Sequence, residues 1–211
     1  MSYDIEIIKK NQNKTSTWAG GTTTELYIYP KDSTYIHRNF MWRLSSAKVE
    51  LEESKFTLLP GINRLIMVIE GELLLFHEGH PDARLKAFEK HSFSGEWNTT
   101  SFGKVTDFNL MMAHGYNGNL EIITFYKDEF KDISLYHCEK NVEKLTEITE
   151  VFYVVEGVVE MITKTKEKIY LSEGDLALIT RTEKEFNSEV KINSICLEDA
   201  KIIKASIFYR G

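Results

Sequence analysis

Short apolar runs make up most of the chain and predict strands almost everywhere. Val, Ile, Tyr, Phe and Thr alternate with polar residues, and Gly, Asn, Asp or Lys interrupts the pattern about every eight to twelve residues. Helix signals are scarce. The pattern predicts an all-β protein whose strands close into a sandwich or barrel. The expected strands are Asp4–Ile8, Thr24–Tyr29, Met41–Leu51, Leu65–Ile69, Glu72–Phe76, Phe108–Met112, Leu120–Tyr126, Val151–Val155, Val158–Thr163, Leu176–Ile179 and Ile202–Phe208.

One dipeptide predicts a tight hairpin. Asn117-Gly118 lies between two of the apolar runs. A type I′ turn needs positive φ at both central residues, which Asn and Gly tolerate best. We therefore expect the chain to reverse direction at these two residues.

A weak internal repeat refines the fold prediction. Segment 66–75 aligns with segment 152–161, 86 residues later, with identities at Val, Glu and Gly. Each copy reads as a strand, a Glu-Gly turn and a return strand. We place a second turn at Gly95-Glu96 and Gly174-Asp175, with a longer loop at 76–85 in the first copy. This succession is the pattern of a cupin barrel, so the repeat predicts a bicupin: two cupin-like β-barrels, or jelly rolls, in one chain.

The boundary between the two barrels is expected in a polar segment. Residues 127–147 begin with Lys-Asp-Glu-Phe-Lys-Asp, which is poor in apolar positions. We therefore expect an N-terminal barrel over residues 1–126, which holds the ligand pocket, and a C-terminal barrel over residues 127–211.

Charge and hydropathy narrow the range of partners. The chain of 211 residues has 26 basic and 32 acidic residues, a net charge of −6, and no basic stripe, so nucleic acid is not an expected partner. The longest apolar run, Leu65–Ile69, is far shorter than the roughly 18 residues that span a bilayer. The start of the chain lacks the apolar core of a signal peptide. We expect a soluble cytoplasmic protein without a membrane partner, and we leave a homodimer open.

The cysteines do not indicate a special chemistry. Cys138 and Cys196 lack the CxxC spacing of a zinc site and are too few for a disulfide scaffold. His137 precedes Cys138, but adjacent strand residues point to opposite faces, which prevents a thiolate–imidazole pair. No nucleophile elbow, phosphate-binding loop or dinucleotide motif is present. We expect both thiols to be reduced and inert.

Histidines are poorly placed for a metal centre. None of the six forms the His-x-His pair of metal-binding cupins, and the second repeat copy, 151–179, has none. His77 and His80 are the best candidates, but Gly79 and Pro81 favour a solvated loop for this pair. We therefore expect no metal and no cofactor.

The most informative polar residues are two arginines. Alternation places Arg43 on the core-facing side of strand 41–51, because the other side ends in two charged residues. Arg64 starts the next core strand and shares a face with its apolar residues. Asp107 and Asn109 share a face on a later strand. A buried guanidinium needs either a protein carboxylate, such as Asp107, or an anionic ligand, and the sequence leaves both interpretations open.

A glycine pair precedes another polar strand. Gly20-Gly21 follows Trp18 and permits close backbone approach or positive φ, so this segment is either a structural turn or the rim of a pocket. Strict alternation predicts that Glu25, Tyr27 and Tyr29 lie on one face of the strand that follows.

Several motifs occur along the chain in a fixed order. They are Trp18-Ala-Gly-Gly-Thr with Glu25, Trp42-Arg43-Leu-Ser45-Ser-Ala47, Phe56-Thr-Leu-Leu-Pro60-Gly61-Ile-Asn-Arg64, Glu70-Gly71, Phe93-Ser-Gly95 and Asp107-Phe-Asn-Leu-Met111.

This order of motifs resembles the HutD/Ves family over roughly residues 5–125, and more loosely to the C-terminus. The resemblance implies a bicupin without the cupin metal ligands. Members of the family accompany histidine-degradation genes and are thought to sense or buffer a pathway intermediate, with N-formylglutamate or urocanate as candidate ligands. No enzymatic activity is assigned to it. Trp18 and Phe93, which belong to the shared motifs, join the two arginines, Asp107 and Asn109 in the expected ligand-binding set.

Two functions follow from these patterns. The first is a metal-independent bicupin that binds a small carboxylate and controls histidine catabolism, with Arg43 and Arg64 fixing the carboxylates. The second is a cupin isomerase or hydrolase that transfers protons through Glu25, Tyr27, His91 or Asp107. We expect binding rather than catalysis and keep the enzyme as the alternative. A metal-dependent oxygenase is disfavoured because the chain lacks His-x-His.

The histidine pattern leads to a prediction about metal content. We expect the purified protein to hold no stoichiometric iron, manganese or zinc, and elemental analysis of the protein measures this directly. One tightly bound ion per chain, with function lost on chelation, would contradict the expectation and favour the oxygenase.

Overall fold

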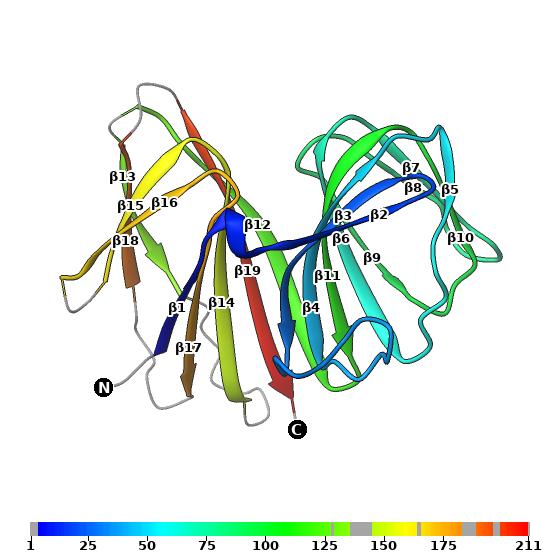
Figure 1. Ribbon diagram of the computed structural model, residues 1–211, viewed down its shortest axis with the longest axis horizontal. Coiled ribbons are helices and arrows are strands. Elements are labelled where there is room, and N and C mark those ends of the chain that lie inside the picture. The colour runs from blue at the N-terminus through cyan, green and yellow to red at the C-terminus, as the bar shows by residue number, and fades with distance from the viewer. Residues whose placement is uncertain are drawn as a thin grey trace. The chain divides into compact units, whose positions relative to one another are not determined.

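The computed structural model describes residues 4–127, 129–135, 145–163, 166–182, 189–195 and 199–210. Within these ranges the chain is almost entirely strand, with one short 3-10 helix, η1, at Lys10–Gln12. None of the described residues forms a helix that is long and apolar enough to cross a bilayer. The chain divides into two compact units, coloured by residue number in Figure 1. The N-terminal barrel is Asn13–Tyr116, and the C-terminal barrel is Met1–Gln12 together with Asn117–Gly211.

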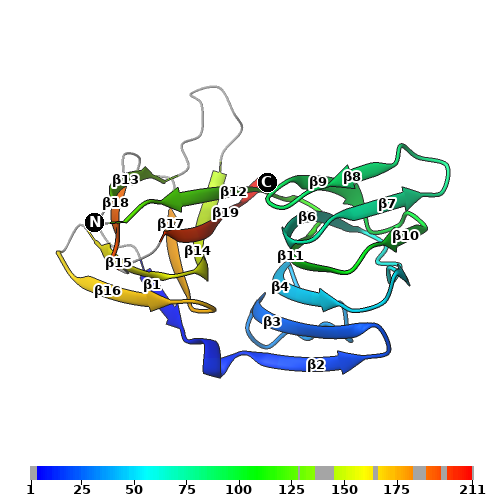
Figure 2. The ribbon, with the colours of Figure 1, turned by 90° about the horizontal axis from the view of Figure 1, so that it is seen from above.

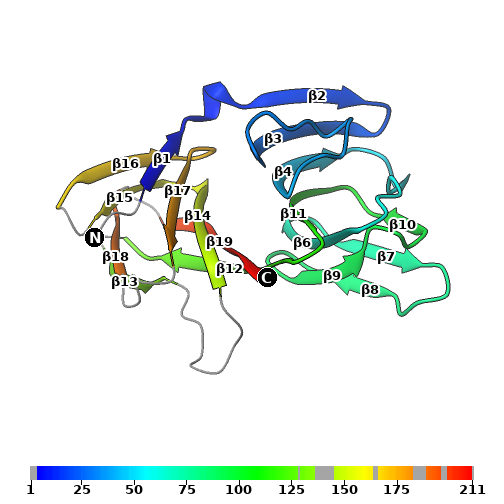
Figure 3. The ribbon, with the colours of Figure 1, turned by 90° about the horizontal axis from the view of Figure 1, so that it is seen from below.

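The N-terminal barrel consists of two antiparallel sheets. Apolar residues of the two sheets, such as Ile66 and Leu75, pack against one another in its core. Figures 2 and 3 show the strands of the larger sheet in succession from opposite sides. Its order is β2 (Lys14–Trp18), β3 (Gly21–Tyr29), β4 (Trp42–Val49), β11 (Val105–Ala113), β6 (Ile62–Glu70) and β9 (Lys90–Ser94). The smaller sheet has the order β5 (Glu53–Lys55), β10 (Thr99–Phe102), β7 (Leu73–His77) and β8 (Ala83–Leu85).

The C-terminal barrel repeats this arrangement. Its core is apolar and includes Phe152, Met161 and Ile202. One sheet has the order β1 (Asp4–Ile8), β17 (Leu176–Thr182), β14 (Leu145–Glu156), β19 (Ala200–Arg210) and β12 (Tyr116–Phe125). The other has the order β13 (Phe130–Ser134), β18 (Glu189–Ser194), β15 (Val158–Ile162) and β16 (Lys168–Ser172).

The Glu-Gly turns of the repeat occupy equivalent places. Gly71 joins β6 to β7 with a φ of 90°, and Gly157 joins β14 to β15 with a φ of 85°. Left-handed backbone at this point favours glycine over any residue with a Cβ. The predicted pair of all-β cupin-like barrels is thus present.

The second turn of the repeat was predicted at the wrong residues in the first barrel. Phe88 N–H donates to Val68 O at 2.7 Å, and Gly174 N–H donates to Val154 O at 2.8 Å. Phe88 therefore stands 86 residues before Gly174, in the same left-handed conformation, with φ of 66° against 84°. Gly95 is not the counterpart of Gly174. Sequence comparison missed this equivalence because phenylalanine rarely adopts positive φ.

The longer loop expected at 76–85 is also absent. The turn at Phe88 keeps the offset of 86 residues, so the connections between paired strands match in length. Strand β7 ends at His77 and β8 begins at Ala83, while β15 ends at Ile162 and β16 begins at Lys168.

The division between the barrels differs from the predicted boundary between residues 126 and 127. Strand β1 pairs with β17, and β12 lies beside β19, so both belong to the C-terminal barrel. Hydrogen bonds between segments that are distant in the sequence decide which sheet a strand belongs to. The polarity of a linker gives no information about that pairing. Residues 1–12 and 117–126 therefore belong to the second barrel rather than the first.

The predicted hairpin at Asn117-Gly118 is wrong for a related reason. Both residues lie within β12. The chain turns at His114-Gly115 instead, where Gly115 has a φ of 85°. Strands β11 and β12 enter different sheets, so the turn changes barrels and forms no hairpin.

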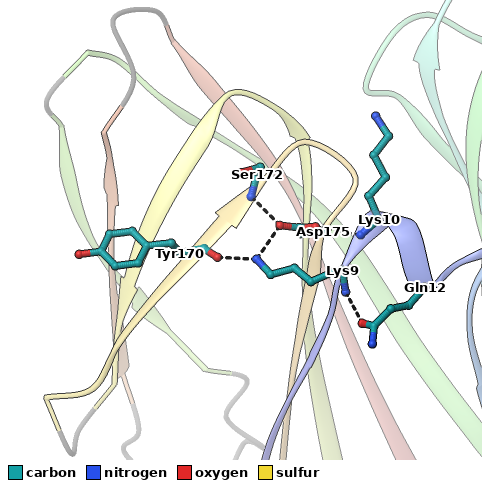
Figure 4. A network of polar contacts seen from close by, with 6 residues as sticks. All are labelled: Lys9, Lys10, Gln12, Tyr170, Ser172 and Asp175. Carbon is teal, nitrogen blue, oxygen red and sulfur yellow. Dashed lines mark hydrogen bonds and ion pairs between the residues drawn. The ribbon is translucent and has the colours of Figure 1, made fainter.

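A polar network fixes the N-terminal segment to the C-terminal barrel (Figure 4). The Asp175 carboxylate accepts hydrogen bonds from Lys9 Nζ at 2.8 Å, from the Lys10 backbone N–H at 2.9 Å and from the Ser172 backbone N–H at 2.9 Å. Lys9 Nζ also donates to Tyr170 O at 2.8 Å. One carboxylate thus orders its own turn and holds the segment that follows β1.

The pKa of Asp175 reflects this network. Burial raises the pKa of the carboxyl, but hydrogen bonds from Lys9, Ser172 and Lys10 outweigh burial and leave the pKa below its usual value. The ionised form is therefore the one that stabilises the fold.

We predict that Asp175→Ala lowers the free energy of unfolding by about 1–3 kcal/mol, because three hydrogen bonds, two of them from backbone N–H groups, lose their acceptor. Urea unfolding measures the loss, and amide hydrogen exchange should locate it at β1 and β17. Glu173→Ala is the control, since Glu173 pairs with Lys10 at an exposed position and its loss should change stability by less than about 0.5 kcal/mol. Equal effects of the two substitutions would contradict the prediction.

Candidate functional site

The inner face of the larger N-terminal sheet gathers polar side chains on its central strands. Met111 of β11 lies opposite Arg43 of β4 on one side and Arg64 of β6 on the other. Asn109 and Asp107 follow at two-residue intervals along β11, so they share the face of Met111. Antiparallel pairing thus places both predicted arginines in one cross-strand row, with the predicted amide and carboxyl beside it.

These residues line a cavity of about 370 Å³ within the N-terminal barrel. The wall combines cationic, hydroxyl and aromatic side chains from both sheets and the adjoining loops. The lining residues are Ser16, Trp18, Thr23, Tyr35, Arg43, Ser45, Ala47, Val49, Ser54, Lys55, Phe56, Thr57, Arg64, Leu73, Ser101, Asp107, Asn109 and Met111.

Arg43 has its charge balanced within the protein. Its Nε donates to Glu25 Oε2 at 2.8 Å, and its Nη1 donates to Ser45 Oγ at 3.1 Å. The Tyr35 ring lies 4.7 Å from its Cζ. The carboxylate that we considered for this role, Asp107, is therefore not the partner of Arg43.

A β-bulge explains how Glu25 reaches Arg43. The register between β3 and β4 shifts between Glu25 and Tyr27, so one extra residue reverses the alternation. Tyr27 and Tyr29 stack on Trp42, with ring centroids 5.1 and 5.6 Å away, on the face opposite Arg43. The prediction that Glu25 shares a face with both tyrosines is wrong.

Arg64 is buried between two aromatic rings and keeps an unmatched donor. Its Cζ lies 4.3 Å from the Phe56 ring centroid and 5.4 Å from that of Phe93. Its Nε is buried and has no hydrogen-bond partner among the described residues. Burial lowers the pKa of the guanidinium to about 10, with Tyr35 and Asp107 acting in the opposite direction. Arg64 is therefore still charged at neutral pH.

Asp107 and Asn109 are buried with open acceptor positions. Neither Oδ1 atom has a hydrogen-bond partner in the part of the chain that the structure describes. Burial raises the pKa of Asp107 to about 7, and the nearby Arg64 offsets this only in part. Asp107 thus carries its proton for part of the time near neutral pH and can then act as a donor.

The remaining two predicted ligand-binding residues lie at the edge of this site. Trp18 lines the cavity with 39% of its surface exposed, and a Cβ on Gly20 would lie 2.0 Å from its ring. The glycine pair thus serves as a structural turn and also makes room for a residue at the rim. Phe93 is buried against Arg64 and is not one of the lining residues.

Three aromatic side chains contact the guanidinium groups, and two of them, Tyr35 and Phe56, were not among the predicted binding residues. Tyr35 comes from the loop between β3 and β4, and Phe56 from the segment after β5. Neither lies in a periodic strand pattern. Ser45 and Met111 share strand faces with predicted residues, and alternation alone could have added them.

The ring of His77 contacts that of His91, whereas the sequence had suggested His80 as its partner for a metal. His77 is the last residue of β7 and is buried, so a solvated loop was the wrong prediction for it. Its Nε2 lies 3.2 Å from His91 Nε2, while the exposed His80 stacks on Trp97 at 3.9 Å. Burial lowers the pKa of both His77 and His91.

No group of three or more His, Cys, Asp or Glu in the described ranges is arranged as a metal centre. His137, Cys138 and Cys196 lie outside the described residues.

The C-terminal barrel holds buried charges that are matched. Glu150 stands 86 residues after Arg64, in the equivalent place on β14. Arg181 Nη2 and Lys204 Nζ lie 3.6 and 3.7 Å from its carboxylate oxygens, and Ser206 Oγ donates to it at 2.6 Å. Arg181, just beyond the second repeat copy, is thus a buried cation that lies beside a carboxylate.

Comparison with known proteins gives one family and a consistent fold. The family model described as HutD matches residues 10–197. A conserved protein of unknown function from Pseudomonas aeruginosa PAO1, PA5104, superposes with a TM-score of 0.74 at 20% identity, covering 99% of this chain and 100% of the other. HutD from Pseudomonas fluorescens SBW25 gives 0.69 at 20% identity, with coverage of 99% and 100%. A mutant of Bacillus subtilis oxalate decarboxylase gives 0.65 at 7% identity, with coverage of 97% and 77%.

The raised pKa of Asp107, about 7, predicts a pH dependence of stability. Between about pH 4 and 7 the folded protein keeps a proton that the unfolded chain has lost, so Asp107 makes stability fall as pH rises through this window. Asp107→Asn removes this contribution, at about 1.4 kcal/mol per pH unit at most. In denaturant unfolding at several pH values, the free energy of unfolding of the variant should therefore rise relative to that of the wild type as the pH increases to 7. Asp32→Asn, at an exposed position, should follow the wild type, and parallel profiles for all three proteins would disprove the assignment.

Proposed function

Because this chain belongs to the HutD family of cupin proteins associated with histidine utilisation, we propose that its N-terminal cavity binds a small carboxylate. The ligand is N-formylglutamate or a urocanate-like compound, and the protein acts as a regulator or buffer of histidine catabolism. Binding requires no metal.

The observation that carries this proposal is the unmatched charge of Arg64. Its guanidinium lines the cavity, and its buried Nε has no acceptor among the described residues. Asp107, the carboxyl group that raises the pKa of Arg64, forms no ion pair with it in the described structure and is partly protonated near neutral pH. A buried cation without a partner is costly, and a ligand carboxylate in a bidentate arrangement removes that cost.

The other polar groups set the chemistry of the rest of the ligand. Asn109 Oδ1 accepts a hydrogen bond and is open, so it suits an N–H donor such as a formamide or an imidazole ring. Protonated Asp107 can donate to a carbonyl or carboxylate oxygen. N-formylglutamate supplies a formamide N–H and two carboxylates, while urocanate supplies a ring N–H and one carboxylate.

Arg43 has a secondary role in this proposal. Its Nε and Nη1 already bind Glu25 and Ser45, so it contributes an ordered wall and its remaining donors. The Arg43–Glu25 pair adds little net charge, and Arg64 therefore supplies most of the attraction for an anion.

A proton-transfer enzyme is the second candidate, and the pKa of Asp107 favours it, because a general acid or base works best with a pKa near the operating pH. Of the four groups considered for this chemistry, Glu25 is engaged by Arg43, Tyr27 lies on the opposite sheet face and His91 pairs with His77. Of these four groups, Asp107 is the one that lines the cavity, so the predicted set supplies a single proton-transfer group there, which favours binding.

We predict that Arg64→Lys weakens carboxylate binding far more than Arg43→Lys. Losing a buried charged hydrogen bond costs on the order of 2–5 kcal/mol, which corresponds to about 30-fold to several-thousand-fold in affinity. Calorimetric titration with N-formylglutamate, glutamate and urocanate measures the loss and ranks the ligands.

Arg84→Lys provides the matched control, because Arg84 is exposed in the same barrel and pairs with Glu72 at the surface. It should bind like the wild type. If Arg64→Lys stays folded and binds a ligand as tightly as the wild type does, the guanidinium is structural and the proposal fails. Turnover of any of the three compounds would favour the enzyme instead.

A further inference from the structure

Two imidazoles meet between the sheets of the N-terminal barrel, outside the proposed ligand cavity. His77 lies at the end of β7 in the smaller sheet and His91 on β9 in the larger sheet. Their Nε2 atoms are 3.2 Å apart and their ring centroids 5.2 Å apart. Neither residue lines the cavity, so the carboxylate site leaves this pair without a role.

The hydrogen bonds around His77 determine which ring nitrogen carries its proton. Thr99 Oγ1 donates its hydrogen to Trp97 O at 3.2 Å. With the hydroxyl hydrogen directed at Trp97 O, the contact of 2.8 Å with His77 Nδ1 is one in which Nδ1–H donates to the hydroxyl oxygen. Neutral His77 therefore presents the lone pair of Nε2 to His91.

Two arrangements satisfy that lone pair. In one, His91 donates its Nε2–H to His77. In the other, His91 carries its proton on Nδ1, which has no hydrogen-bond partner within the described part of the chain, and both Nε2 lone pairs bind the same ion. Two nitrogens bound to one tetrahedral ion at about 2.0–2.1 Å lie about 3.3–3.4 Å apart, close to the observed separation.

We infer that His77 and His91 form a binding site for one divalent transition-metal ion of the zinc, nickel and copper class, with water completing the coordination. Imidazole suits these ions. The hydrogen bond from His77 to Thr99 supplies the fixed tautomer that metal-binding histidines require. The ion replaces the hydrogen bond between the rings, and because His91 changes tautomer, the two neutral rings lose no proton.

The surroundings hold the two rings in place. The Phe93 ring packs on both imidazoles, with centroids 4.9 Å from His77 and 5.9 Å from His91, and Trp97 packs edge-on against His77 at 5.2 Å. A bound ion would link the two sheets. With only two protein ligands the ion exchanges with solvent, which is compatible with purified protein that holds no stoichiometric metal.

The test is calorimetric titration of the full-length protein with zinc chloride. We expect one Zn²⁺ per chain, with affinity at least tenfold lower in His91→Gln. His80→Gln is the matched control, because His80 lies in the adjoining turn and stacks on Trp97 instead of facing the pair, and it should bind within twofold of the wild type. Circular dichroism confirms that each variant is folded.

Two further measurements separate this site from an incidental one. Thr99→Val removes the acceptor for His77 Nδ1–H without contacting the ion, so it should weaken binding about 10–100-fold. Imidazole nitrogen NMR should show Zn²⁺ shifting Nε2 of both rings. If wild type and His91→Gln bind Zn²⁺ equally, if His80→Gln loses as much as His91→Gln, or if saturating Zn²⁺ leaves both Nε2 signals unchanged, the pair is only a hydrogen bond and the inference is wrong.

Discussion

The burial of one guanidinium without a carboxylate is the constraint that organises the N-terminal barrel. Arg64 lies on a central strand, 5% exposed, between the rings of Phe56 and Phe93. Aromatic faces stabilise such a cation by about 2 kcal/mol or more when it is desolvated, yet they supply no acceptor for its N–H groups. The cavity beside Arg64 is also lined by Asp107 and Asn109, whose Oδ1 atoms have no hydrogen-bond partner in the described structure.

The two barrels handle buried charge in different ways. The C-terminal barrel has Glu150 where the N-terminal barrel has Arg64, and it surrounds that carboxylate with Arg181, Lys204 and Ser206. Both of these cations therefore lie beside a carboxylate. Of the two buried arginines of the N-terminal barrel, Arg43 has such a partner, Glu25, and Arg64 has none among the described residues. The two barrels thus share their turns and strand order, but the first buries an arginine, Arg64, that forms no ion pair in the described structure.

Much of the fold was predictable because its signals are local. Period-two alternation correctly placed Arg43, Asp107 and Asn109 on an inner face, and the repeated Glu-Gly turns revealed the duplication. The errors arose where one residue changed the geometry. The bulge after Glu25 reversed the alternation on β3, and Phe88 adopted the left-handed conformation that its counterpart Gly174 takes. A β-bulge adds one residue to the pairing register, and the residues of a single strand do not reveal where it occurs.

The sequence by itself determined the all-β class, the two cupin-like halves and the inward arginines, because hydrophobic period and turn residues act over a few neighbouring positions. Only the tertiary structure decided which groups meet. Arg43 forms its ion pair with Glu25 and not with Asp107. Strands β1 and β12 belong to sheets of the second barrel. The ring of His77 contacts His91, whereas the sequence had suggested His80 as its partner for a metal. Each of these outcomes depends on strand pairing or sheet packing between segments that are distant in the sequence. Such contacts form only in the folded barrel, so a local sequence pattern does not reveal them.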